Sequence, residues 1–406
     1  YSGTDTLSFV GAVPFLGVSS DLMVPGLGVG LALAVPTGRG GKLQDFDGPN
    51  RYALREGNIQ TIHTMVAASY RLKEKVSLGM SGSLVNSRYY ADTDTTIYPD
   101  LAQGVADILV LDEQPASYQD GYVEHPGYTA GSIFELKDTT FTFGAGVYLT
   151  PIGDRLGLSL AYNHGMRLDH TGDLTLDFRC PPAFDPQSRA AAEEIGTCNR
   201  TATGSGSIGY RLPSRLHLGV VLQPIQRLRL ELMGGYVFWS VFTDYEVSTS
   251  VSNAAFPGAS NALAAQEAAL LASQERLWAR DHHDTFWVGL DGKAEVVGPL
   301  SLGARLIYDQ GAVDEQSVSA NNYDADTVLL GGLIDVTPAG PISFSLSFSH
   351  QFLADRIVTD SPFGVGVDPS AFDGRYFYPS ANGTYSGSIN RIGLAVRGRF
   401  LGGGGL

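Results

Sequence analysis

Apolar and polar residues alternate one by one along most of this chain of 406 residues, so that every second residue is apolar. The segment 342–351 is a clear case, because Ile342, Phe344, Leu346 and Phe348 alternate with serines. A period of two is the pattern of a β-strand with one apolar and one polar face. One such strand could lie half-buried in a soluble sheet, but a dozen would need a second layer to cover them. The alternation therefore favours a β-barrel with apolar side chains toward lipid and polar side chains toward a lumen.

Very short connections take turns with very long polar segments. The short ones are expected at 19–25, 71–75, 150–154, 223–226, 297–299 and 337–340, and the long ones at 38–57, 91–138, 169–204, 243–282, 312–325 and 355–384. Bacterial outer-membrane barrels have short periplasmic turns and long external loops. We therefore predict an all-β, transmembrane antiparallel β-barrel that crosses the bacterial cell outer membrane many times.

The alternation predicts 13 strands. They are expected at 6–18, 26–37, 58–71, 75–90, 139–150, 155–168, 205–222, 227–242, 283–296, 300–311, 326–337, 341–354 and 386–400. Single-chain bacterial barrels have an even number of strands, and the last strand should end at the periplasmic rim with Phe400. One upward strand is therefore expected before the first, giving 14 in the intact protein. We interpret residues 1–400 as one barrel domain and residues 401–406 as a tail or linker.

Composition and motifs exclude several functions. The net charge of −15 argues against nucleic acid as a partner. The GxGxxG match at 204–209 leads into a strand, whereas dinucleotide binding needs a helix there. His282, His283 and Asp284 stand together, but no further metal ligand is evident. We expect no enzyme activity, no metal site and no cofactor.

Two cysteines, Cys180 and Cys198, lie in one polar segment. In an oxidising compartment they are expected to form a disulfide that closes this loop. The alternative is a pair of free thiols.

Several segments resemble the FadL/TodX family of outer-membrane transporters. They are 26–38, 68–79, 143–148 with 158–172, 212–219 with 237–240, and 308–310 with 324–326. The resemblance implies a 14-stranded barrel plugged by an N-terminal hatch. It also implies passive transport of long-chain fatty acids or aromatic hydrocarbons from the external loops, through the upper lumen and sideways into the membrane at a kinked strand. The hatch and the first strand have no counterpart in this chain.

One external loop supplies the first candidate ligand-binding residues. A helix capped by Asp100 is expected in the loop 91–138, with one apolar face. The resemblance places a helix of this pattern over a hydrophobic groove, and the alternative is packing on a neighbouring loop. The residues of this face are Leu101, Val105, Ile108 and Leu109. A second external helix is expected at 261–280.

The lumen supplies the other candidates. Charged inward positions gather near the short turns, where ion pairs bracing the barrel are favoured. Higher up, the inward positions Val237, Trp239 and Trp287 are apolar. An amphiphile with a carboxylate head would want a nearby cation, and the candidates are Lys137, Arg167 and Arg280.

The strand 26–37 is expected to be irregular. Pro36 cannot donate a ladder hydrogen bond, and Gly26, Gly28 and Gly30 weaken a strand and allow it to bend. Together with the family's kinked strand, these residues suggest a lateral opening. The alternative is that the glycines only admit close packing of a lumen loop.

Expected partners are hydrophobic small molecules, with outer-membrane lipid and lipopolysaccharide around the barrel. The long external loops leave room for a protein partner. Two other functions remain open at this point. A polar-solute porin would need charge along its whole lumen, and a structural or partner-binding barrel would act through its long loops, such as 243–282.

Overall fold

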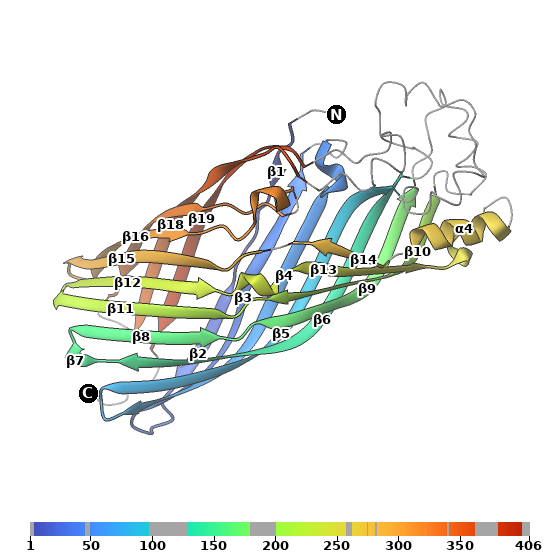
Figure 1. The fold of residues 1–406 in the computed structure, drawn as a ribbon. Helices are drawn as coiled ribbons and strands as arrows, with labels where there is room; N and C mark the ends of the chain where they lie inside the picture. The colour runs from blue at the N-terminus through green and yellow to red at the C-terminus, as the bar shows by residue number, and fades with distance from the viewer. Residues whose placement is uncertain are drawn as a thin grey trace.

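One antiparallel sheet forms the wall of the molecule (Figure 1). The computed structural model describes residues 4–44, 49–96, 129–178, 200–256, 262–273, 275–280, 282–320, 322–338, 341–361 and 381–399. Within these ranges the sheet has 18 strands, and a nineteenth short strand, Pro151–Asp154, lies outside it. Among the described helices, none is long and apolar enough to cross a membrane.

The strands follow one another around the wall. Their bounds are β1 Leu7–Ser8, β2 Phe15–Ser20, β3 Leu27–Leu43, β4 Glu56–Leu72, β5 Val76–Thr96, β6 Thr129–Leu149, β7 Pro151–Asp154, β8 Leu156–Asn163, β9 Met166–Phe178, β10 Arg200–Leu212, β11 Arg215–Ile225, β12 Leu228–Val237, β13 Asp244–Val251, β14 Glu275–Ala279, β15 Thr285–Val297, β16 Leu300–Asp309, β17 Thr327–Val336, β18 Ile342–Val358 and β19 Gly383–Gly398. The helices are η1 Pro49–Tyr52, η3 Trp239–Val241, η4 Asn253–Ala255, α4 Ala262–Ala272 and η5 Glu315–Ser317.

Several crossings of the wall are made by two strands in succession. These are β1 with β2, β8 with β9, β10 with β11, β12 with β13, and β14 with β15. Counted in this way, the described wall has the 13 crossings that the alternation predicts, and the all-β barrel class is confirmed. β2 pairs only with β3 and β19 only with β18 among the described residues, so the wall is open between these two strands.

The short turns lie at one end of the wall, called here the short-turn end. Two of them use left-handed backbone at residues other than glycine, namely Leu22 with Met23 and Lys73 with Glu74. Two successive residues with positive φ are the signature of the type I′ turn, whose twist matches that of a β-hairpin. The strand pairing on both sides thus holds these residues in a conformation that is costly for them alone.

The two faces of the wall differ as the alternation predicts. Side chains such as Leu232, Phe286 and Phe348 are about half exposed on the outer face. On the inner face near the short-turn end, ion pairs join Arg305 of β16 with Asp291 of β15, Lys293 of β15 with Asp335 of β17, and Arg229 with Glu231 within β12. The outer face therefore suits lipid, and the charges inside are paired with one another.

The wall is taller on one side than the sequence predicts. Loops are expected at 91–138, 169–204 and 243–282, yet strands continue into all three segments, and β5 and β6 reach 21 residues each. A tilted strand needs only 9–11 residues to cross a bilayer. The extension runs over β5, β6, β9, β10, β13 and β14, toward the end with the long loops (Figure 1). We call this end the long-loop end.

The helix expected at 261–280 is correct only in its first half. α4 ends at Ala272, and 275–279 forms β14, paired with β13 from Asp244 to Ser248. Residues 275–279 form a strand because they pair with β13, whose backbone groups on this edge would otherwise have no hydrogen-bond partners.

Four neighbouring crossings are broken near the same height. The breaks fall between β8 and β9, β10 and β11, β12 and β13, and β14 and β15. Polar side chains satisfy the backbone there. Ser214 Oγ accepts hydrogen bonds from the Gly165 amide (2.9 Å) and the Tyr162 hydroxyl (3.0 Å), and Asp284 Oδ1 accepts one from the Ser240 amide (2.8 Å).

The inner ion pairs should differ in their contribution to stability. The Asp335 carboxylate is buried and binds both Lys293 and Ser345, whereas the Asp291–Arg305 pair faces the open lumen. Asp335→Asn should lower the free energy of unfolding by about 1.5–3 kcal/mol, because a hydrogen bond to a charged group is lost. Asp291→Asn should cost less than about 1 kcal/mol, as exposed pairs do. Urea unfolding of the detergent-solubilised barrel measures both. Equal losses would contradict the ranking.

Candidate ligand chamber

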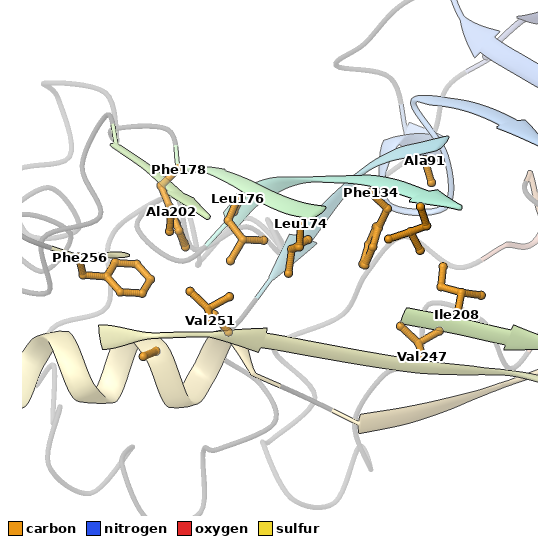
Figure 2. Packing of buried hydrophobic residues seen from close by; sticks show 14 of the residues in the cluster. Ala91, Phe134, Leu174, Leu176, Phe178, Ala202, Ile208, Val247, Val251 and Phe256 are labelled. Carbon is orange, nitrogen blue, oxygen red and sulfur yellow. The ribbon is translucent and has the colours of Figure 1, made fainter. Parts of the chain in front are cut away.

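The inner face of the tall part of the wall is apolar. It carries what we call the upper apolar cluster, a set of buried side chains that pack against one another (Figure 2). Its members are Ala91, Ala130, Phe134, Leu136, Leu168, Leu174, Leu176, Phe178, Ala202, Ile208, Tyr210, Phe242, Val247, Val251, Phe256, Ala265, Ala269 and Ala272. The alternation explains the set, because most of the inward positions on β6, β9, β10 and β13 are apolar.

α4 packs on the outermost part of this cluster. Its small residues Ala265, Ala269 and Ala272 are buried, and Leu263 and Leu270 are exposed. Figure 2 shows Phe256 and Val251 close to the helix, with Phe178 and Ala202 opposite. The helix therefore packs through Ala265, Ala269 and Ala272, whose small side chains allow close approach, and turns Leu263 and Leu270 away.

Tyrosines and one histidine form a polar centre within the cluster. His170 is 0% exposed, and its Nε2 lies 2.8 Å from Ser87 Oγ. The Tyr210 ring stacks on His170 at 5.6 Å and meets Tyr245 edge-on at 4.9 Å. The Tyr210 hydroxyl and His170 Nδ1 are buried and have no hydrogen-bond partner among the described residues. A buried polar atom in this state costs about 1–3 kcal/mol, so both are ready to bind a polar group.

Arg280 brings a charge into this centre. Its side chain is 3% exposed, and the guanidinium carbon lies 4.6 Å from the centroid of the Tyr245 ring. Burial lowers the pKa of Arg280, and the nearby hydroxyls of Tyr245 and Tyr89 act in the opposite direction. The backbone of Arg280 is fixed by its amide, which donates to the carbonyl of Thr243 at 2.6 Å.

An aromatic floor, made of Trp239, Phe242 and Trp287, lies between the cluster and the ion-paired part of the lumen. η3 turns out of the strand ladder after β12, and its neighbour Phe242 is buried against Tyr210 and Tyr245. Trp239 stacks on His282 at 5.5 Å. Trp287 faces inward on β15, 5.8 Å from His217.

The sequence-based site residues have different outcomes. Val237 and Trp287 lie on the inner face of β12 and β15, Trp239 packs against the upper apolar cluster, and Arg280 is buried beside Tyr245; their role as ligand contacts stays a prediction. The expected helix residues Leu101, Val105, Ile108 and Leu109 lie outside the described residues, as do Cys180 and Cys198. The loop helix and the disulfide therefore stay predictions.

Lys137 and Arg167 are corrections. Lys137 follows the buried Leu136, so the pleat turns it to the outer face, where it is exposed. Arg167 lies on the face opposite Leu168 and His170, and its guanidinium binds Asp169 (2.8 Å) and Glu246 (2.6 Å). Lys137 lies in the extension of its strand, where the alternation puts it outside. Arg167 lies within the expected strand 155–168, but the break between β8 and β9 at residues 164 and 165 reverses the parity of the inward positions and turns Arg167 outward. Neither can bind a head group in the lumen.

Sequence reasoning missed Tyr89, His170, Tyr210 and Tyr245. His170 and Tyr245 lie in segments expected to be loops, and Tyr89 lies at the end of the expected strand 75–90. Tyr210 lies within the expected strand 205–222, where the break between β10 and β11 reverses the parity of the inward positions. Once the strands are extended, their spacing with buried neighbours such as Leu168 and Ile208 places them inward. The signal was therefore the alternation itself, continued past the length of a membrane crossing.

β3, the strand expected to be irregular, has a break in its pairing near Pro36. The register of β3 against β4 shifts between Ala34 and Thr37, around Pro36. On the other side of β3, pairing with β1 covers Lys42 and Leu43 and pairing with β2 covers Val29 to Ala34. Residues 9–14 between β1 and β2 lie outside the ladder. The wall is thus irregular on both sides of one strand.

An apolar outer face that closes around a charged lumen is stable only with lipid as its solvent. The class of this protein is therefore an outer-membrane β-barrel, here with an apolar chamber above an ion-paired lumen. Residues 2–332 match the family model "Outer membrane protein transport protein (OMPP1/FadL/TodX)". The chain belongs to this family of outer-membrane transporters of hydrophobic compounds, as the sequence resemblance predicts.

Solved structures of similar fold agree with this assignment. A Pseudomonas aeruginosa FadL homologue has a TM-score of 0.64 and 16% identity, with 94% of this chain and 76% of that chain covered. The Pseudomonas putida toluene transporter TodX has a TM-score of 0.64 and 13% identity, with 95% and 82% covered. The Ralstonia pickettii toluene transporter TbuX has a TM-score of 0.60 and 14% identity, with 96% and 81% covered. Comparison with curated proteins gives no match.

The aromatic floor should restrict the passage of ions. Phe242→Ala removes a buried ring that packs on Tyr210, Tyr245 and His282, so the lumen should widen and the single-channel conductance in planar bilayers should rise severalfold. Phe238→Ala is the control, because Phe238 is exposed and packs against the outward Tyr236. Equal conductance of the two variants would show that Phe242 does not limit the pore.

Proposed function

We propose that this protein passively carries hydrophobic molecules, either long-chain fatty acids or aromatic hydrocarbons, from its external loops through the upper apolar cluster and sideways into the membrane. The observation that carries the proposal is the apolar and aromatic inner face above the height of the membrane. A polar-solute porin would need side chains that are charged, or that form hydrogen bonds with water, along its whole passage. In the described wall, the inner ion pairs gather instead near the short-turn end.

The first step of the proposed route is capture of an amphiphile, tail first, among the apolar side chains of the cluster. Burial of a chain contributes about 0.8 kcal/mol per CH₂ group, so a long acyl chain is favoured without any polar contact. The carboxylate head then lies near Arg280, where a charge-assisted hydrogen bond is strong because water is excluded. The Tyr210 hydroxyl would supply a second donor beside it.

The second step is a lateral exit beside β3. A molecule that continued downward would have to pass the aromatic floor and then the charged pairs, an environment that disfavours an apolar solute. On β3 the inward positions Gly28, Gly30 and Ala32 carry little or no side chain, which leaves room next to the irregular part of the wall. Pro36 and η3 each lie about 10 residues from the short turns, a distance that spans the bilayer. The aromatic floor and the irregular part of β3 would thus lie at the same depth, close to the outer surface of the membrane.

The head-group role of Arg280 can be separated from a structural role. Arg280→Gln should weaken binding of palmitate about tenfold or more, since a hydrogen bond to a charged group is worth about 1.5–3 kcal/mol. Binding of toluene should stay unchanged because it has no charge to lose. Isothermal titration calorimetry on the detergent-solubilised barrel measures both ligands.

The matched control is Arg211→Gln, which makes the same change on the outer face of β10. The Arg280→Gln barrel should stay folded. A buried charge is costly to remove from water, and the neutral amide of Gln avoids this cost. Unchanged palmitate binding in Arg280→Gln would remove the head-group role. A parallel loss of toluene binding would mean that Arg280 only shapes the chamber.

The lateral route is tested by filling the space beside β3. The double variant Gly28→Val and Gly30→Val should reduce uptake of palmitate into proteoliposomes severalfold, because the new side chains narrow the inner face at the exit. A Cβ at Gly28 would meet the movable Ser69 Oγ at 2.7 Å, and one at Gly30 would meet the Val18 carbonyl at 3.5 Å and Ser19 Cβ at 3.9 Å, so the strand can accept both.

A matched control exists on the far side of the wall. Gly219→Val places a Cβ against Ser159 Oγ at 2.5 Å, and Gly331→Val meets its neighbours at 3.4 Å. Both glycines face inward, so this double variant narrows the lumen equally but away from β3. The lateral route is wrong if a folded Gly28→Val/Gly30→Val barrel transports as well as the wild type, or if both double variants lose uptake alike.

A further inference from the structure

The outer face of β5 and β6 changes character in three steps toward the long-loop end. Leu84 and Phe141 face each other across the two strands and are 49% and 60% exposed. Two residues further along, Thr139 Oγ1 donates to Asn86 Oδ1 at 3.1 Å. Two residues beyond that, Arg88 stands directly opposite Lys137. The sequence of rows is apolar, neutral polar and then basic.

The basic row lies just outside the hydrocarbon. Arg88 and Lys137 are each about 13 residues along their strands from the short turns, beyond the 9–11 residues that cross a bilayer. At about 3.4 Å per residue, the row is roughly 14 Å along the strands from the Leu84–Phe141 row. This is the depth at which a membrane lipid carries its head group.

Like charges directly opposite each other destabilise a strand pair. Both side chains are exposed, and neither has an ion-pair or hydrogen-bond partner among the described residues. Of the acids on the same face of β6 and β9, Glu135 faces Asp173 one row further out, and Asp169 lies one row nearer the short turns, where Arg167 binds it. The two cations are therefore left to repel each other unless an external anion joins them.

A second pair of like charges on the next two strands gives the contrast. Arg167 stands opposite Arg211 across β9 and β10. Here the protein supplies its own anions, because Arg167 binds both Asp169 and Glu246. The chain thus neutralises one basic pair internally and leaves the other without an anion.

We propose that Arg88 and Lys137 form a binding site for a phosphate group of lipopolysaccharide. The apolar row below would contact the acyl chains, the Asn86–Thr139 row would lie beside the sugar, and the two cations would share the phosphate through charge-assisted hydrogen bonds. The site lies on the outer face, so it goes beyond the transport function and is independent of the ligand chamber. It would fix the taller side of the wall in the lipopolysaccharide layer.

The test compares lipids that differ only in phosphate. Native mass spectrometry of the detergent-solubilised full chain should show binding of bisphosphorylated lipid A. Arg88→Gln/Lys137→Gln should weaken this binding about tenfold or more, because both charge-assisted hydrogen bonds to the phosphate are lost. Lipid A from which both phosphates have been removed should bind the wild type more weakly. The control is Lys73→Gln/Lys75→Gln, which removes the same charge at a short turn.

Three outcomes would overturn the proposal. Equal lipid A binding by the double variant and its control would show that the row is not the site. Equal binding of the two lipid A forms would show that phosphate is not recognised. Displacement of lipid A by inorganic phosphate at similar concentration would indicate a general anion site. The heat-dependent shift of the folded barrel on gel electrophoresis verifies that both variants are folded before they are compared.

Discussion

In hydrocarbon, a backbone amide or carbonyl without a partner costs several kcal/mol, and no water is present to replace the lost hydrogen bond. The ladder between neighbouring strands is the constraint on which this structure depends. It explains where irregular backbone is found. The unbroken lower strands β8, β11, β12 and β15 have 8, 11, 10 and 13 residues, close to the length of a bilayer crossing. The breaks begin where water and polar side chains can serve the backbone again.

Much of the wall could be predicted because the same physics shapes its sequence. A strand between lipid and a lumen must alternate, and a hairpin at the short-turn end must be tight. Both leave a signal within a few residues. The height of the wall leaves a weaker signal in the sequence. Residues 129–137 and 166–178 are polar on one face, as a loop would be, and become strands only because their other face joins the upper apolar cluster. Whether these segments form strands therefore depends on contacts between residues that are far apart in the chain.

The same reasoning explains which of the expected site residues face the lumen and which face outward. Trp287 was placed by alternation within a strand whose bounds were nearly right, and it faces inward. Lys137 was placed in a loop, where no face is defined, and it faces out. Arg280 follows β14, a strand that the sequence assigned to a helix, yet its burial brings it to the tyrosines. Its position depends on the pairing of β13 with β14, which no local pattern in the sequence reveals.

The one-sided height of the wall has a kinetic consequence. A hydrophobic solute outside the cell meets a layer of hydrated saccharide, in which it dissolves poorly and through which it diffuses slowly. β5 and β6 continue about 10 residues past the hydrocarbon, roughly 30 Å along the strand. Their inner face offers apolar contacts along this distance. A solute that adsorbs at the far end then searches along one dimension instead of three, and the rate of arrival at the membrane depends on the length of this track rather than on solubility in the layer it bypasses.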